Sequence, residues 1–222
     1  MVASTSKQQS GSLKDFCSNK NHMIPSLLVN CVNALDKYRL DFQGIYRING
    51  QGSQVQKLLK ELKGSKEIVN LDKILKYDTE TITGCIKAFL KEIRDPLIPL
   101  YLFEDFYQAC DSELDFKIHD AILKLPKPHQ DTLIYMFGHW NRVVINSEKN
   151  LMTLENLAYC LAPTVVGIYM EKDIKIDAVG EEIEKQIKIM RRLLSMPQKY
   201  WQHFIENSQE GQKSFQNSVF YI

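Results

Sequence analysis

The sequence predicts an all-α protein, folded as a single-domain helical bundle. Apolar residues recur at intervals of three and four over several long segments, which is the spacing that places them on one face of a helix. The alternating pattern with hairpin dipeptides that indicates paired strands is missing from the sequence. The 222 residues, 44% of them hydrophobic, are enough for one sizeable core. A usual size of about 100 to 200 residues per domain favours one domain over two.

The first two helices are expected on either side of a short loop. The first covers residues 24–35, where Pro25 suits the first helical turn. Its apolar stripe consists of Ile24, Leu27, Leu28, Cys31, Val32 and Leu35. The second begins at Ser53, because residues 53–56 have the form of a capping box, and Gly64 is expected to end it in the left-handed conformation. Its stripe consists of Val55, Leu58, Leu59 and Leu62.

The later helices follow from the same spacing. One is expected over residues 82–93 and is ended by Asp95 and Pro96. Its stripe consists of Ile82, Cys85, Ile86, Phe89, Leu90 and Ile93. Three further stripes consist of Leu133, Phe137, Trp140 and Val144; of Leu154, Leu157, Ala158, Leu161 and Val165; and of Ile183, Ile187, Met190 and Leu194. The helical domain is expected over residues 13–206, between a disordered tail at 1–12 and a polar tail at 207–222.

Composition excludes several classes of function. The 28 basic and 27 acidic residues nearly cancel, so nothing indicates the one-signed surface that attracts nucleic acid. No apolar run approaches the about 18 residues of a transmembrane segment, and a secretory signal is missing. The five cysteines form no Cys-x-x-Cys pair and are expected to be reduced thiols without a metal. These features predict a soluble, cytoplasmic protein whose electrostatic function is local.

The segment GIYRING, residues 44–50, places Arg47 within an apolar run closed by Gly44 and Gly50. This loop connects the first two expected helices, and Ile45 and Ile48 are expected to fix it to the core. Two interpretations fit. Arginine can satisfy helix C-terminal carbonyls or an acidic neighbour inside the domain, or a rigid loop can present it to another molecule.

Two other helices carry polar features with similar alternatives. Lys87, Lys91 and Arg94 lie on the side of their helix away from the apolar stripe. Cations in a last turn relieve the helix dipole, which accounts for the latter two but leaves Lys87 for an anionic partner. Asn156 and Thr164 lie eight apart on roughly one side of a helix that Pro163 bends or ends, and such groups are often satisfied within a core.

Together these segments resemble the Rho-family GTPase-activating domain, the RhoGAP family, over residues 24–201. The resemblance rests on four ordered blocks: IPSLLVNCVNAL, GIYRING, IKAFLKEIRDPLIP and NLAYCLAPTVV. Within the family, LAPTVV and the closing LLSMPQKYWQHFI are most similar to the Rac-type members of the centralspindlin complex. That similarity implies a role in cytokinesis, a location at the spindle midzone or division site, and a centralspindlin kinesin as partner through regions outside these residues.

The resemblance implies that the domain binds a GTP-loaded Rho- or Rac-type GTPase and inserts Arg47 as an arginine finger. Gly44, Tyr46 and Gly50 would set the geometry of the finger loop. GTP and Mg²⁺ would be carried by the partner, and the chain would need no cofactor of its own. A guanidinium is permanently charged and forked, so it can neutralise the charge that develops during phosphoryl transfer.

The resemblance also assigns GTPase contacts to Lys87, Lys91 and Arg94 on one segment and to Asn156 and Thr164 on another. It implies in addition that Lys87 and Lys91 brace the finger loop. Three positions depart from the family pattern: Lys91 stands where arginine is usual, Ala162 where glycine is usual, and Thr164 where asparagine is frequent. Lysine lacks the bidentate fork of arginine, so these departures bear on rate and on partner choice.

Other functions fit less well. The chain lacks a Gly-x-x-x-x-Gly-Lys-Ser/Thr loop, so it is not expected to hydrolyse nucleotides itself. Aromatic residues are expected in the core instead of on a base-stacking platform: Tyr101, Phe103, Phe106, Tyr107, Trp140 and Trp201. A second hypothesis stays open, in which the domain docks on a GTPase, another protein or a lipid headgroup without accelerating hydrolysis.

Overall fold

The computed structural model describes residues 11–17, 22–112, 114–167 and 176–209. Within these ranges the chain is helical apart from turns and two isolated β-bridges, which confirms the all-α prediction. The elements are η1 (Leu13–Phe16), α1 (Ser26–Tyr38), α2 (Gly52–Lys63), α3 (Asp72–Leu75), α4 (Thr79–Glu92), η2 (Leu100–Leu102), α5 (Phe103–Asp111), α6 (Asp115–Leu123), α7 (Lys127–Ile145), α8 (Ser147–Asn150), α9 (Leu154–Val165), α10 (Ile176–Leu194) and α11 (Gln198–Gln209). Most of the two expected tails, at 1–10 and 210–222, lies outside the described residues.

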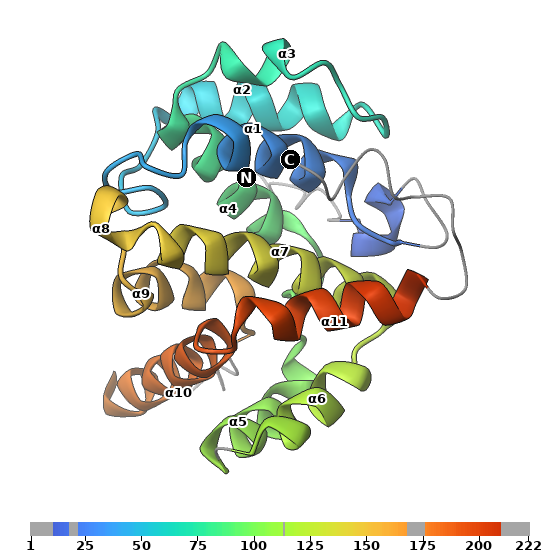
Figure 1. The fold of residues 1–222 in the computed structure, drawn as a ribbon, viewed down its shortest axis with the longest axis vertical. Helices are drawn as coiled ribbons and strands as arrows, with labels where there is room; N and C mark the ends of the chain where they lie inside the picture. The colour runs from blue at the N-terminus through green and yellow to red at the C-terminus, as the bar shows by residue number, and fades with distance from the viewer. Residues whose placement is uncertain (1–10, 18–21, 113, 168–175, 210–222) are drawn as a thin grey trace, which may run out of the picture.

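Helix α7 crosses the middle of the molecule, with α1 to α4 on one side and α5, α6 and α10 on the other (Figure 1). It packs against α1, α10 and α11, while α4 packs against α1, α2 and α9. A short, tight segment carries the chain from α7 through α8 into α9. The loop between α1 and α2 lies beside α8 at one edge of the bundle (Figure 1).

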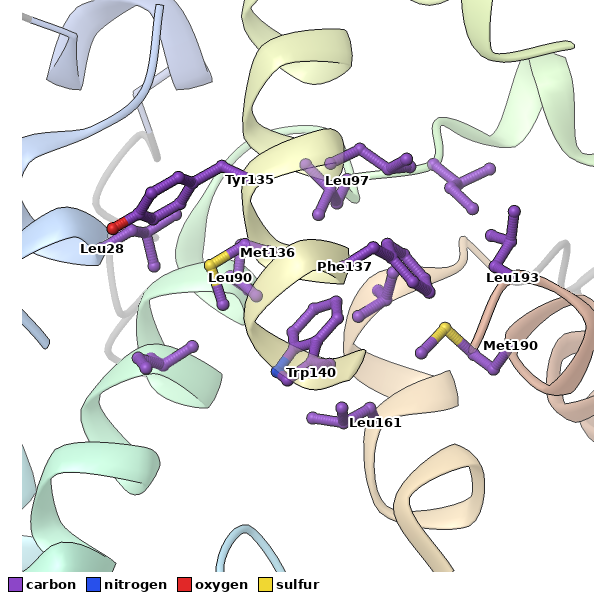
Figure 2. Close-up of a cluster of buried hydrophobic side chains, with 14 of the residues drawn as sticks. Leu28, Leu90, Leu97, Tyr135, Met136, Phe137, Trp140, Leu161, Met190 and Leu193 are labelled. Carbon is purple, nitrogen blue, oxygen red and sulfur yellow. The ribbon is translucent and has the colours of Figure 1, made fainter. Parts of the chain in front are cut away.

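The core forms around α7 because this helix is buried on most of its circumference. Figure 2 shows Met136, Phe137 and Trp140 of α7 meeting side chains from neighbouring helices, with Leu90 and Leu161 among them. Both tryptophans are fully buried, as expected, and the ring of Trp201 stacks on Phe137 with centroids 5.1 Å apart. The expectation for Tyr101 was wrong, because 68% of its surface is exposed.

The structure corrects several helix boundaries. Helix α2 begins at Gly52, so Ser53 lies inside the helix and is not its N-cap. Gly64 ends α2 with φ −73° and ψ −16°, a right-handed and not a left-handed conformation. Helix α4 begins earlier than its apolar stripe, because the Asp78 side chain accepts a hydrogen bond from the backbone N–H of Thr81. Pro163 does not end α9, which continues to Val165.

Candidate functional site

Residues 39–51 connect α1 to α2, and this 39–51 loop carries the GIYRING segment. Its turn is tight, because the backbone N–H groups of Arg47 and Ile48 both donate to the carbonyl of Gly44, at 2.8 and 2.9 Å. Gly44 has φ +77°, which favours glycine. At the other end, a β-carbon on Gly50 would lie 2.7 Å from the backbone of Glu80, so only glycine fits against the first turn of α4.

Tyr46 anchors the 39–51 loop in the core. Its side chain is fully buried although its φ is +67°, a left-handed conformation that costs a non-glycine residue about 1 to 2 kcal/mol. Ile45 is buried as expected, at 1% exposure, but Ile48 is 43% exposed and does not fix the loop. The expectation for Ile48 was wrong because the turn after Tyr46 points the following side chains outward.

Arg47 is exposed, and no carboxylate pairs with it among the residues that the structure describes. Its guanidinium lies near Gly44, where a β-carbon would be 3.6 Å from Nη2. Of the two interpretations of this arginine, the structure favours presentation to another molecule, since the side chain forms no ion pair within the described residues.

Lys87 of α4 reaches across to the 39–51 loop. Its Nζ donates to the carbonyl of Tyr46 at 2.8 Å and to Oδ1 of Asn49 at 3.3 Å. Burial, together with the nearby Lys91 ammonium, lowers the pKa of Lys87. The two contacts fix the loop on either side of Arg47.

The other two cations of this segment, Lys91 and Arg94, lie apart from this contact. Lys91 is exposed one turn beyond Lys87. Arg94 lies past the end of the helix, where its backbone N–H donates to the carbonyl of Gly11. A hydrogen bond from the Ser12 side chain lowers the pKa of Asp15, and the Arg94 charge adds to this effect. The structure therefore places Arg94 beside the N-terminal segment and does not bring it to Arg47.

Helix α9 contributes the third side of the site. Burial raises the pKa of the Cys160 thiol, while the charges of Lys87 and Arg47 lower it, so both cations lie within electrostatic range of this side chain. One turn earlier, Nδ2 of Asn156 donates to the carbonyl of Leu151 at 3.2 Å. Thr164 is only 4% exposed. Its expected role as a GTPase contact stays a prediction.

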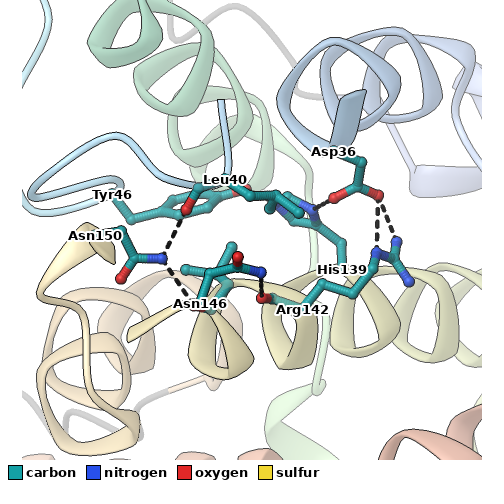
Figure 3. Close-up of polar contacts among 8 residues, drawn as sticks. Asp36, Leu40, Tyr46, His139, Arg142, Asn146 and Asn150 are labelled. Carbon is teal, nitrogen blue, oxygen red and sulfur yellow. Dashed lines mark hydrogen bonds and ion pairs between the residues drawn. The ribbon is translucent and has the colours of Figure 1, made fainter. Parts of the chain in front are cut away.

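A buried polar network supports the 39–51 loop from behind (Figure 3). The Tyr46 hydroxyl lies 2.8 Å from Nε2 of His139, and Nδ1 of His139 lies 2.6 Å from Oδ1 of Asp36. Arg142 donates to Oδ2 of Asp36 from Nε at 3.0 Å and from Nη2 at 2.5 Å. The carbonyl of Asn150 accepts from the backbone N–H of Gly44 at 2.8 Å.

Sequence reasoning missed this network. His139 and Asp36 are 103 positions apart, and neither belongs to a recognisable motif. The only available signal is the placement of His139 and Arg142 on one face of a strongly apolar helix, three residues apart. Polar groups in such a place need buried partners, although their spacing does not say which.

The arrangement presents one free guanidinium from a loop that is braced by a lysine in front and by a hydrogen-bonded network behind. Such a group can enter the site of another molecule and donate two hydrogen bonds to phosphoryl oxygens. The described residues bring no three His, Cys, Asp or Glu side chains together as a metal site. Within the same residues, no helix is long and apolar enough to cross a bilayer.

Known proteins share both the sequence and the fold. The chain is 30% identical over 215 residues to Rac GTPase-activating protein 1 of Mus musculus, covering 95% of this chain and 34% of that protein. It is 34% identical over 178 residues to Rho GTPase-activating protein 12 of Macaca fascicularis, covering 79% of this chain and 21% of that protein. The chain therefore spans about a third or less of the length of these relatives.

A solved structure agrees with this similarity. The crystal structure of human Rho GTPase activating protein 15 superposes with a TM-score of 0.72 at 28% identity, covering 88% of this chain and 97% of that one. The model of the RhoGAP domain family matches residues 25–169, a range that contains the 39–51 loop, α4 and α9. Since the match extends over more than half of the sequence, this chain belongs to the RhoGAP family.

Proposed function

We propose that this chain is a GTPase-activating domain that binds GTP-loaded Rho-family GTPases and accelerates their GTP hydrolysis by inserting Arg47. The observation that carries the proposal is the exposed guanidinium of Arg47 on the 39–51 loop, without a carboxylate partner among the described residues. Family membership supports the same conclusion. GTP and Mg²⁺ belong to the partner.

The proposed mechanism is electrostatic. As the γ-phosphoryl group separates, negative charge develops on its oxygens and toward the leaving group. A guanidinium donated in trans meets that charge with two hydrogen bonds in a site from which water is excluded. In Ras, such an arginine contributes about 10³- to 10⁵-fold in rate. Lys87 adds positive charge beside Arg47, while Asn156 stabilises the first turn of α9.

Similarity over 95% of the chain to Rac GTPase-activating protein 1 favours Rho- or Rac-type partners. The proposed location at the division site and the proposed kinesin partner rest on the resemblance of LAPTVV and LLSMPQKYWQHFI to the Rac-type members of the family. The kinesin would bind through regions outside these residues.

Single-turnover GTP hydrolysis by Rho and by Rac tests the proposal. The wild-type domain should accelerate hydrolysis, and Arg47→Ala should lose about 10³-fold of that acceleration while still binding the GTP state. Arg47→Lys should recover little, because lysine lacks the fork. Equal rates with wild type and Arg47→Ala, with binding intact, would establish instead a binding module that docks without catalysis.

A further inference from the structure

The network behind the 39–51 loop has a fixed hydrogen-bond direction. Arg142 has only donors, and both of its contacts end on Oδ2 of Asp36. Burial opposes ionisation of Asp36, but the neighbouring His139 and Arg142 outweigh it and lower the pKa of this carboxyl. Asp36 is therefore a carboxylate that only accepts hydrogen bonds, and Nδ1 of His139 is the donor to its Oδ1.

That direction determines what the other imidazole nitrogen does. Because Nδ1 donates to Asp36, Nε2 is the imidazole atom left to share a hydrogen bond with the hydroxyl of Tyr46, 2.8 Å away. Both Tyr46 and His139 are fully buried, so the loss of this bond would leave two polar atoms without water as a substitute. The chain of bonds thus specifies where the Tyr46 ring can sit.

Tyr46 is held at two points. Its hydroxyl is bound from behind by His139 of α7, and its carbonyl is bound from the front by Lys87 of α4. Its left-handed backbone conformation is unfavourable for tyrosine and persists only because these contacts compensate for it. Arg47 is the next residue, so the direction of its side chain follows from the placement of Tyr46.

We propose that Asp36 and His139 are positioning residues for Arg47: they orient Tyr46, and Tyr46 sets the conformation from which the arginine reaches its partner. This inference rests on the proposed function, because it assigns the distant residues a role in the same reaction. A residue that only positions the arginine should change the rate within the complex and not the affinity of the complex.

Tyr46→Phe tests the inference, because it removes one hydroxyl and keeps the ring. At saturating concentrations of the domain, the single-turnover rate of GTP hydrolysis should fall about 10-fold. The Kd for the GTP-loaded GTPase should stay within about 2-fold of the wild-type value. His139→Gln should retain more of the rate than His139→Leu, since the glutamine amide can still form a hydrogen bond with the Tyr46 hydroxyl. An unchanged saturating rate in Tyr46→Phe would overturn the proposal.

Asn141→Ala is the matched control for loss of stability. Asn141 is a buried polar residue of α7 whose side chain donates to the carbonyls of Leu194 and Met196. Among the described residues, it forms no side-chain hydrogen bond with the 39–51 loop. Its replacement should lower the melting temperature about as much as Tyr46→Phe but leave the saturating rate unchanged. Equal loss of rate in both variants would show that His139 and Asp36 are only structural and would overturn the proposal.

A measurement on the domain alone separates this inference from the proposed function. The backbone N–H groups of Gly44, Arg47 and Ile48 are hydrogen-bonded in the 39–51 loop. Their hydrogen exchange should be faster in Tyr46→Phe and unchanged in Asn141→Ala. If no GTPase responds to the wild-type domain, the proposed function fails. Faster exchange in Tyr46→Phe would then still support the placement of the loop by His139, and equal exchange would overturn it.

Discussion

Lys87 is an ammonium group whose partners are two oxygen atoms without formal charge, the carbonyl of Tyr46 and the side-chain amide of Asn49. Burial and then the repulsion of Lys91 lower its pKa in the folded state. The sign follows directly. A lysine whose pKa is lowered by folding reduces stability below that pKa, and the cost disappears between that pKa and the higher pKa of the unfolded chain. Lys87 is therefore not explained by a contribution to stability.

We expect Lys87→Met to slow GTP hydrolysis by about 10-fold at saturating concentrations of the domain, because the 39–51 loop loses its two hydrogen bonds to Lys87 of α4. The melting temperature should change by less than about 4 °C, since methionine keeps the apolar stem and removes a partly buried charge. Single-turnover kinetics and thermal unfolding by circular dichroism measure the two effects. Lys91→Met is the control, because exposed Lys91 should affect only the Kd. If Lys87→Met and Lys91→Met both weaken binding and leave the saturating rate unchanged, Lys87 acts by contacting the partner.

Individual residues differ in how far the sequence could predict them. Arg47 and Lys87 could be placed because a motif and a helical spacing point to them. Tyr46 could be assigned to the finger loop, but its hydrogen bond to His139 could not be predicted, since the two residues are 93 positions apart. The burial of Thr164 and the exposure of Ile48 depend on how neighbouring elements pack, which no local pattern records.

At the scale of elements, the crossing of α2 and α4 determines how the 39–51 loop enters α2. Gly84 of α4 faces Val55 of α2, and a β-carbon at Gly84 would lie 2.8 Å from Cγ2 of Val55. Such a distance is too short for two carbon atoms, so the helices approach this closely only with glycine. The same approach brings Gly50 against the backbone of Glu80.

Gly84→Ala is expected to lower the free energy of unfolding by about 1 to 3 kcal/mol, because the added methyl group overpacks the crossing. Val55→Ala alone should also be destabilising, by about 1 kcal/mol or more. The double variant should be more stable than the sum of the two predicts, by about 0.5 kcal/mol or more, since the smaller side chain accepts the methyl group. Urea unfolding of the four proteins measures the coupling, and strict additivity would show that the two residues do not limit the approach.

The existence of the helices could be predicted more readily than their ends. The six apolar stripes lie largely within α1, α2, α4, α7, α9 and α10. Helices α3, α5, α6, α8 and α11 were not predicted. The start of α2 was missed because Gly50 packs on Glu80 and the helix already begins at Gly52, which leaves Ser53 inside it. Gly64 was misjudged because its N–H still bonds to the carbonyl of Lys60, so the chain leaves α2 by a right-handed turn.

At the scale of the whole molecule, the core extends beyond the region that the family model matches, which ends at residue 169. Helices α10 and α11 bury side chains against α7, among them Met190 and Trp201. Trp201 stacks on Phe137 in the centre of the bundle. The C-terminal helices are therefore part of the folded unit that positions the 39–51 loop.

Trp201→Ala should lower the free energy of unfolding by about 3 to 5 kcal/mol, because it leaves a large cavity beside Phe137. Urea unfolding followed by far-ultraviolet circular dichroism measures this change. Phe116→Ala is the control, since Phe116 is 61% exposed on α6 and its loss should cost less than about 0.5 kcal/mol. A small effect of Trp201→Ala would mean that α11 is dispensable for the fold.

The two tryptophans differ in what they can report. Trp140 lies edge-on to Tyr46, with ring centroids 6.5 Å apart, whereas Trp201 stacks on Phe137. Replacing Trp201 by phenylalanine would leave Trp140 as the single indole emitter of the chain, directly behind the residue that precedes Arg47. Its emission would then report on the arginine-bearing segment in real time, without any attached dye.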